Sequence, residues 1–206
     1  MHELTIAVLP GDGIGREVMR ACLPLFEKLS LPIKLKYAEI GWQCWQRDGC
    51  VIPNETWRVI DTADSILLGA TMSLPKREAI AALPNAMQAD PPDYVSPIIQ
   101  LRKYLKVYAN VRPCFNIKGT GVPFDFCIIR ENTEGLYAGF DYHPAPPDIV
   151  NLIQKSAYWQ SLPNNTISAS LRLQSATGLL RIFTYAFDYA IQHGYSCVTF
   201  ADKPNV

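Results

Sequence analysis

Charge is scarce in this chain, and the charge that is present is balanced. Of 206 residues, 19 are lysine or arginine, 19 are aspartate or glutamate, and charged residues make up 18% of the total. A surface that binds nucleic acid needs clustered positive charge, so we expect no nucleic-acid partner. Long apolar runs are also missing. None approaches the roughly 20 residues that cross a bilayer, and we expect no membrane span.

A secretion signal and paired cysteines are missing as well. The N-terminus has no basic segment followed by an apolar run. The six cysteines include no CxxC pair, and no histidine lies at metal-finger spacing from them. A chain of this size, with 49% hydrophobic residues, can form a core without disulfides. We therefore expect reduced thiols in a cytoplasmic protein.

The first third of the sequence alternates strand-like and helix-like segments. Apolar residues Val18, Cys22, Leu25 and Leu29 recur at spacings of four, three and four, which indicates one face of a helix. The expected strands are 4–9, 33–38 and 65–69, and the expected helices are 16–29, after the turn 11–15, and 54–63. This βαβ rhythm predicts an α/β fold with a parallel sheet covered by helices.

A proline-rich segment interrupts this rhythm at residues 83–97. It has few periodic apolar positions, so we expect a long loop of the kind that is either functional or disordered. Ser96 and Pro97 suit the N-cap and the first position of a helix. That helix carries Arg102 and is expected to end near Lys106.

The last part of the sequence predicts one long helix among short strands. Ser175 is placed to cap the helix, and His193-Gly194 provides a basic last turn followed by a C-terminal glycine. The strands expected in this half are 108–111, 124–129, 167–173 and 197–201.

Three glycines follow the first expected strand and open the first expected helix. Gly11, Gly13 and Gly15 are spaced G-x-G-x-G, whereas the dinucleotide-binding fingerprint is G-x-G-x-x-G. Taken alone, the motif therefore favours a tight turn that needs positive φ and close packing of a helix on a strand.

Three arginines are better candidates for a binding site. Arg102 lies on the helix after the proline-rich loop, Arg112 follows the strand 108–111, and Arg130 ends the strand 124–129. The ends of strands form the usual ligand edge of an α/β fold. A small polycarboxylate needs several guanidinium groups, because each can hold one carboxylate through two hydrogen bonds. The alternative is that these are surface arginines in ordinary salt bridges.

The surroundings of these arginines resemble the metal-dependent decarboxylating dehydrogenases of the isocitrate/isopropylmalate family. Four blocks occur in the family's order and cover essentially the whole chain. They are LPGDGIG at 9–15, SPIIQLRK and YANVRP at 96–103 and 108–113, RENTEGLYAG at 130–139, and DKPNV at 202–206. The resemblance implies the fold of that family, an α/β arrangement with a mixed sheet flanked by helices.

The resemblance assigns substrate binding to four residues. Arg102, Arg112 and Arg130 would bind the substrate carboxylates, and Ser96 would contact the distal group of the substrate. Ser96 could serve only as a helix N-cap, and both roles are compatible.

It also assigns the chemistry. Tyr137 would be the general acid at the carbon that loses carbon dioxide, and Lys203 would assist removal of the proton from the substrate hydroxyl. Asn205 would lie near the nicotinamide, as would Thr71 or Ser73, between which the sequence does not choose. Hydride would pass from C2 to NAD (NADP is possible), and Mg²⁺ or Mn²⁺ would polarise the resulting ketone. The alternatives without a catalytic role are a core tyrosine at 137 and a solvated lysine at 203.

The family's architecture divides the chain into residues 1–98, part of a cofactor-side domain, and 99–206, an incomplete substrate and dimerisation domain. The family lysine reaches into the partner's site, so the resemblance implies a homodimer with shared active sites. The family's acidic metal ligands and its adenine-binding segment lie beyond the position of Val206. We therefore expect a truncated chain without a complete metal site.

The substrate stays open among related acids. The RENTEG block favours isocitrate, homoisocitrate or a tartrate-like acid as substrate, and the stretch YANVRPC at 108–114 resembles that of NAD-type isocitrate dehydrogenases, which makes such an enzyme the leading interpretation. Ile98 stands where tricarboxylate-specific enzymes often have asparagine, which favours a less polar distal group, although Lys76 and Arg77 could receive a distal carboxylate. The alternatives are a homoisocitrate, 3-isopropylmalate or tartrate/malate dehydrogenase. A non-catalytic regulatory or truncated homologue is the alternative from another class.

Overall fold

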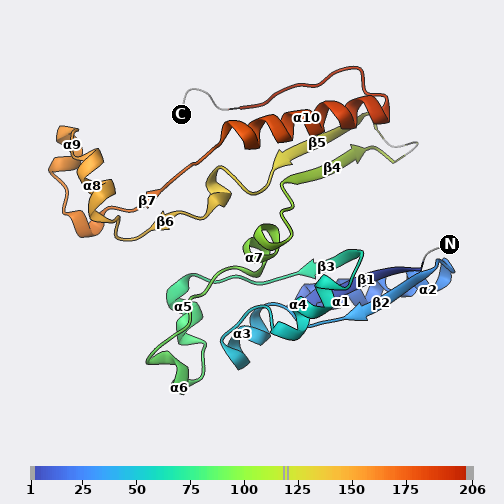
Figure 1. Ribbon diagram of the computed structural model, residues 1–206, viewed down its shortest axis with the longest axis horizontal. Coiled ribbons are helices and arrows are strands. Elements are labelled where there is room, and N and C mark those ends of the chain that lie inside the picture. Colours follow the sequence, from blue (N-terminus) through green and yellow to red (C-terminus); the bar gives the residue numbers. More distant parts are fainter. Residues whose placement is uncertain (1–2, 118, 120, 203–206) are drawn as a thin grey trace. The chain divides into compact units, whose positions relative to one another are not determined.

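The chain divides into two compact units, Met1–Leu101 and Arg102–Val206. A computed structural model describes residues 3–117, 119 and 121–202, and Figure 1 shows the elements of each unit. Each unit has its own β-structure.

The first unit is built on a parallel sheet of three strands. Its strands are β1 (Leu4–Gly11), β2 (Ile33–Tyr37) and β3 (Ser65–Ala70), in the order β2-β1-β3. The central strand β1 is the most apolar, and its residues Ala7, Val8 and Leu9 are fully buried. The expected parallel sheet is thus confirmed, with bounds within two residues of those expected from the sequence.

Six helices accompany this sheet. They are α1 (Ile14–Cys22), α2 (Pro24–Lys28), α3 (Trp42–Asp48), α4 (Asn54–Asp61), α5 (Lys76–Ala81) and α6 (Asn85–Gln88). The single helix expected over 16–29 begins at Ile14 and is divided before Pro24, because proline cannot donate the backbone hydrogen bond that would continue α1. No helix is expected from the sequence at the position of α3, and α6 lies inside the segment expected to be one long loop.

The apolar face expected for the first helix is wrong. Val18, Leu25 and Leu29 are each more than half exposed, whereas Met19 is buried. Helix α1 packs on β1 and β3, and its glycine, Gly15, lies so close to Ala70 and Pro10 that a Cβ there would clash with their carbonyl oxygens. Close backbone approach, rather than the apolar stripe, therefore decides which side of α1 faces the sheet.

The glycine-rich turn after β1 is confirmed as a structural turn. Gly11 has a φ of 77°, which favours glycine. Beside it the buried carboxylate of Asp12 accepts hydrogen bonds from the backbone amides of Trp42 (2.6 Å), Gln43 (3.3 Å) and Met72 (3.3 Å). One carboxylate thus connects the turn to the start of α3 and to the segment after β3.

Aromatic packing anchors the proline-rich segment in the first unit. Trp45 is 1% exposed, and its indole nitrogen donates to the carbonyl of Ala79 at 2.7 Å. The ring of Tyr94 meets those of Trp45 and Trp42 edge-on, with centroids 4.9 and 6.2 Å apart. The predicted long loop is therefore packed against the core.

The second unit centres on a β-hairpin and a long helix. The two strands are β4 (Ala109–Phe115) and β5 (Asp125–Glu131), which are antiparallel, and α10 (Ala176–His193) packs on β5. Helix α10 begins after Ser175 and ends at Gly194 with a left-handed conformation, as expected. Helix α7 (Pro97–Tyr104) starts at the expected residue and crosses the boundary between the units.

A small lobe completes the second unit. It contains β6 (Asp141–Tyr142), β7 (Ala169–Ser170), α8 (Pro147–Ile153) and α9 (Ala157–Gln160), with short 3-10 helices η1 (Leu136–Ala138) and η2 (Asn164–Thr166). Ala145, Val150 and Ile167 form its core. No helix in the described ranges is both long enough and apolar enough for a membrane crossing. All six cysteines are free thiols.

Two strand predictions in this unit are wrong. Residues 197–201 form no strand, and of 167–173 only Ala169–Ser170 pairs as one, with an isolated bridge from Leu173 to Gly135. Residues of 197–201 and of β5 line one cavity of about 870 Å³, and the segment pairs with none of the described strands. Arg112 also lies in the middle of β4 and not at a strand end.

Substitution of Asp12 tests the role of its buried carboxylate. We expect Asp12→Ala to lower the free energy of unfolding of the first unit by about 2–4 kcal/mol, because three backbone amides, that of Trp42 in a buried hydrogen bond, lose their acceptor. Urea unfolding followed by tryptophan fluorescence is suitable, since Trp42, Trp45 and Trp57 all lie in this unit. The control Glu55→Ala removes an exposed carboxylate and should change stability by less than about 0.5 kcal/mol. Equal effects of the two variants would contradict the proposed role.

Candidate functional site

Two of the expected substrate arginines converge on the expected catalytic tyrosine in the second unit. Arg102 comes from the last turn of α7, Arg130 from β5, and Tyr137 from η1. The guanidinium carbon of each arginine lies 5.0 Å from the centroid of the Tyr137 ring. Tyr137 is 38% exposed, so it is a surface residue between two cations and not a core tyrosine.

The register of the hairpin brings the third arginine to the same face. Asn110 pairs with Arg130, and Arg112 pairs with Ile128. Because alternate residues of a strand share a face, Asn110, Arg112 and Arg130 lie on one side of the hairpin. Arg112 donates from Nε to Oδ1 of Asn110 at 2.6 Å, which fixes the orientation of its guanidinium group.

The positive charge of this cluster is not neutralised within the described part of the second unit. Burial, then the nearby charge of Arg130 and to a lesser degree that of Arg112, holds the pKa of Arg102 below its ordinary value, against an opposing effect of Tyr137. None of the three arginines has a carboxylate within 4.0 Å among the ion pairs of the described residues. The Nε of Arg130 is buried without a hydrogen-bond partner. Guanidinium groups without a carboxylate partner, one of them with a buried Nε, are suited to bind a polyanion.

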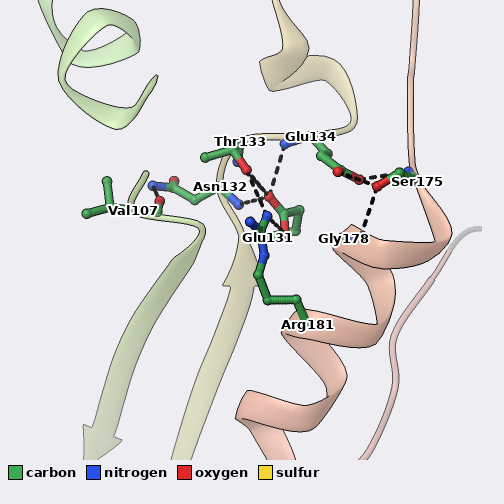
Figure 2. Close-up of polar contacts among 8 residues, drawn as sticks. All are labelled: Val107, Glu131, Asn132, Thr133, Glu134, Ser175, Gly178 and Arg181. Carbon is green, nitrogen blue, oxygen red and sulfur yellow. Dashed lines mark hydrogen bonds and ion pairs between the residues drawn. The ribbon is translucent and has the colours of Figure 1, made fainter. Parts of the chain in front are cut away.

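A turn organised by Glu131 follows Arg130 directly (Figure 2). The Oε1 atom of Glu131 accepts hydrogen bonds from the backbone amides of Asn132 (2.9 Å), Thr133 (2.7 Å) and Glu134 (3.0 Å), and from the Thr133 hydroxyl (2.8 Å). The side chain of Asn132, which is 5% exposed, donates to the carbonyl of Val107 at 3.0 Å. The turn between Arg130 and Tyr137 is therefore fixed by its own acidic residue and tied to the start of β4.

The hydrogen bonds of this turn determine the charge of Glu131. Burial alone would raise its pKa, but the hydrogen bonds from Thr133, Glu134 and Asn132 together hold the pKa below its ordinary value of 4.5. Glu131 is thus ionised at neutral pH. Its second oxygen, Oε2, is buried without a hydrogen-bond partner and lies 4.0 Å from Nη2 of Arg181 on α10.

A second acidic residue of the same block fixes the start of α10. Glu134 accepts from the backbone amide of Ser175 at 2.8 Å and from its hydroxyl at 2.7 Å, while the hydroxyl accepts from the amide of Gly178 at 2.9 Å. Figure 2 shows these contacts in a row from the turn to the first turn of the helix. The RENTEG block therefore both carries Arg130 and connects it to the longest helix.

In the first unit, two expected site residues are hydrogen-bonded to each other. The hydroxyl of Ser73 donates to that of Ser96 at 3.1 Å. Ser73 and Thr71 both follow the carboxyl end of β3, where ligands bind in parallel sheets. The structure brings Ser73, and not Thr71, together with Ser96. Lys76 is in an exposed ion pair with Asp93 at 2.8 Å.

Two expected catalytic and cofactor residues, Lys203 and Asn205, lie outside the described residues. Asp202, which precedes them, pairs with Arg172 at 2.9 Å. Within residues 3–202 as described, no group of three or more histidine, cysteine, aspartate or glutamate side chains could hold a metal ion. The position of the family's metal ligands beyond Val206 stays a prediction.

Sequence reasoning missed the acidic residues that organise the site. It assigned roles in the RENTEG block only to Arg130 and Tyr137, and it did not single out Arg181. Glu131 carried no recognised turn signal, since the side chains known to bind nearby backbone amides in turns are Asp, Asn, Ser and Thr. The bond from Glu134 to Ser175 joins residues 41 positions apart, and no local pattern predicts it.

Comparison with known proteins finds relatives that match the chain along both units. The family model for isocitrate/isopropylmalate dehydrogenase matches residues 5–206. Protein DlpA of Legionella pneumophila is 54% identical over 98% of this chain, which covers 33% of that protein. The 3-isopropylmalate dehydrogenase of Methanothermobacter thermautotrophicus is 32% identical over the whole of this chain, with 52% of its own length covered.

A solved structure agrees with this assignment. The crystal structure of isocitrate dehydrogenase from Methylococcus capsulatus matches 94% of this chain with a TM-score of 0.69 and 27% identity, and 49% of that protein is covered. The expected fold of the family is thereby confirmed. The chain spans about half the length, or less, of the relatives that it matches.

The ionised state of Glu131 predicts a pH-dependent stability. Its pKa is lower in the folded chain than in the unfolded chain, so its charge stabilises the fold above pH 4.5, and this contribution is lost as the pH falls through the folded-state value. We expect Glu131→Gln to be less stable than the parent chain at pH 7 by about 1–3 kcal/mol. The difference should shrink as the pH falls below 4.5. Protection of the amides of residues 132–134 from hydrogen exchange at each pH measures it, and a difference independent of pH would contradict the assignment.

The contact between Gly178 and Glu134 predicts that glycine is more stabilising than alanine at position 178, the reverse of the usual order in helices. Alanine normally stabilises a helix by about 1 kcal/mol relative to glycine. A Cβ at Gly178 would overlap the carboxylate of Glu134, so we expect Gly178→Ala to lower the thermal midpoint measured by circular dichroism. In a Glu134→Ala background the same substitution should instead be neutral or stabilising. A stabilising effect of Gly178→Ala in the parent chain would show that the carboxylate is not fixed there.

Proposed function

Because the chain belongs to the isocitrate/isopropylmalate dehydrogenase family, we propose that it supplies the substrate-binding residues of an enzyme that oxidatively decarboxylates a 2-hydroxy polycarboxylic acid. The leading substrate is isocitrate, converted to 2-oxoglutarate with hydride transfer to NAD or NADP. The observation that carries this proposal is the group of arginines around Tyr137, whose charges no described carboxylate neutralises.

Each arginine has a distinct part in the proposed reaction. Arg102 and Arg130 both contact the ring of Tyr137. Each would hold one substrate carboxylate through two hydrogen bonds. Arg112 would hold another, in the orientation that its bond to Asn110 fixes. Binding by three fixed guanidinium groups orients the substrate and removes much of the entropic cost of reaction. The Tyr137 hydroxyl would then protonate the carbon from which carbon dioxide leaves.

The cofactor side of the proposal rests on the first unit. When bound, NAD would accept the hydride from C2 of the substrate. Ser73 is the better of the two candidates for contact with the nicotinamide, because its hydroxyl is bonded to Ser96. Lys203 would take the proton of the substrate hydroxyl, Asn205 would lie near the nicotinamide, and a homodimer would bring the lysine of one chain to the tyrosine of the other. No step is assigned to Mg²⁺ or Mn²⁺ within this chain, since its described residues do not form a site for them.

A second substrate class has a specific observation in its favour. Ile98 lies two residues after Ser96 on α7, and an apolar side chain there suits a substrate such as 3-isopropylmalate, whose distal group is an alkyl group. Homoisocitrate and tartrate or malate remain related candidates. A regulatory homologue would bind the acid without turnover, and the presence of Arg102, Arg130 and Tyr137 together supports the catalytic proposal over that one.

Calorimetric titration with isocitrate, homoisocitrate, 3-isopropylmalate and tartrate tests the arginine site. We expect one of these acids to bind the chain, and Arg102→Ala or Arg130→Ala to weaken its affinity by about 100-fold, because each removes one charged fork from a carboxylate. The control Arg58→Ala removes an exposed arginine of the other unit and should leave affinity unchanged. Binding that survives both site substitutions would place the acid elsewhere and would end the proposal.

The same preparations also test the expectation that the chain cannot complete the reaction alone. With isocitrate, Mg²⁺ and NAD, the 206-residue chain is expected to produce no NADH, because its described residues form no metal site. Turnover by the purified chain would show that the necessary metal ligands are already present in it.

A further inference from the structure

We propose that Arg181 of α10 is a positioning residue, which holds the Glu131 turn in place and thereby orients Arg130 and Tyr137. The inference rests on the proposed function, since its purpose is to fix the arginine site. Three contacts carry it: Arg181 faces the unpaired oxygen of Glu131, lies near the Thr133 hydroxyl, and covers the ring of Tyr108.

Among the described residues, Arg181 is the one cation within 4.0 Å of Oε2, the second carboxylate oxygen of Glu131. Oε1 is fully used by the turn, whereas Oε2 is buried without a hydrogen bond and lies 4.0 Å from Nη2 of Arg181. The same Nη2 lies 3.4 Å from the Thr133 hydroxyl. Figure 2 shows Arg181 extending from α10 toward this turn. A buried carboxylate oxygen requires a compensating charge, and Arg181 provides it from outside the turn.

The contact with Tyr108 fixes the other side of Arg181. Its guanidinium carbon lies 4.2 Å from the centroid of the Tyr108 ring, and Tyr185 of α10 meets that ring edge-on at 6.0 Å. The carbonyl of Tyr108 accepts a hydrogen bond from the amide of Asn132 at 2.8 Å. Arg181 thus contacts both the residue before β4 and the turn after β5, and it connects these two segments to α10.

The consequence for the site follows from chain order. Arg130 immediately precedes Glu131 and points to the opposite face of β5, and the turn leads within a few residues to Tyr137. A displaced turn would therefore displace both members of the Arg130–Tyr137 contact. An ordinary exposed ion pair would have no such effect and would contribute little to stability. Arg181 differs because its carboxylate partner is largely buried, with 17% of that side chain exposed.

The first test is spectroscopic and requires no substrate. The Nε–Hε group of Arg130 is buried, so its NMR cross-peak should be protected from solvent exchange, and it can be assigned by its loss in Arg130→Lys. We expect Arg181→Met to move this cross-peak by more than its linewidth, and Arg181→Lys to move it less because lysine retains the charge but not the planar fork. The matched control Arg58→Met, which breaks an exposed pair with Glu55 at 3.1 Å, should leave it in place. An unchanged Arg130 cross-peak in folded Arg181→Met overturns the proposal.

The second test is a double-mutant cycle on isocitrate affinity. We expect Arg181→Met to weaken isocitrate binding roughly tenfold in the parent chain and by less than about twofold in an Arg130→Ala background, because it acts through Arg130. The same loss in both backgrounds would mean that Arg181 acts independently of Arg130 and would overturn the proposal. If isocitrate does not bind the parent chain at all, the proposed function fails on that substrate, and the NMR result alone decides whether Arg181 positions Arg130.

Discussion

Three successive backbone amides and one hydroxyl donate to a single oxygen, Oε1 of Glu131. The arrangement keeps the carboxylate ionised and fixes the backbone between Arg130 and Tyr137 without help from a regular element. The contact between Arg130 and Tyr137 depends on this turn, because the turn is the stretch of backbone that joins the two residues. Positive charge gathered for a ligand repels itself, and a rigid acidic turn behind it is one way to keep the charges in place.

The first unit uses the same device at a different position. Asp12 accepts from amides of three separate places in the chain, as the turn after β1 meets the start of α3 and the segment after β3. In both units a buried or half-buried carboxylate accepts from backbone amides, which makes it an organiser of loops. A family motif can therefore contain residues that act on the ligand next to residues that only hold the backbone in place. GDGIG proves structural, and RENTEG contains both kinds.

The sequence predicted those features that are determined by residues close to them in the chain. The bounds of α10 followed from Ser175 and Gly194, which act on the helix ends beside them. The face of α1 that was expected to be buried is exposed. Periodicity identifies an apolar stripe, but it does not reveal the close backbone approach that Gly15 permits. The segment 197–201 has a strand-like composition but no neighbour to pair with. The convergence of the arginines came from the resemblance, and spacing alone would not have given it. The contacts of Glu134 and Arg181 with distant residues had no local signal.

One detail of the α10 cap limits which amino acids can occupy its position. Aspartate and serine are usually interchangeable as helix caps, since either can accept from the first free amides. Here the Ser175 hydroxyl must accept from Gly178 and at the same time donate to Glu134. An aspartate could do only the first, and it would set two carboxylates against each other. The position thus tolerates a hydroxyl but not an acid, so a substitution that helix statistics class as conservative would here separate the RENTEG turn from the helix behind it.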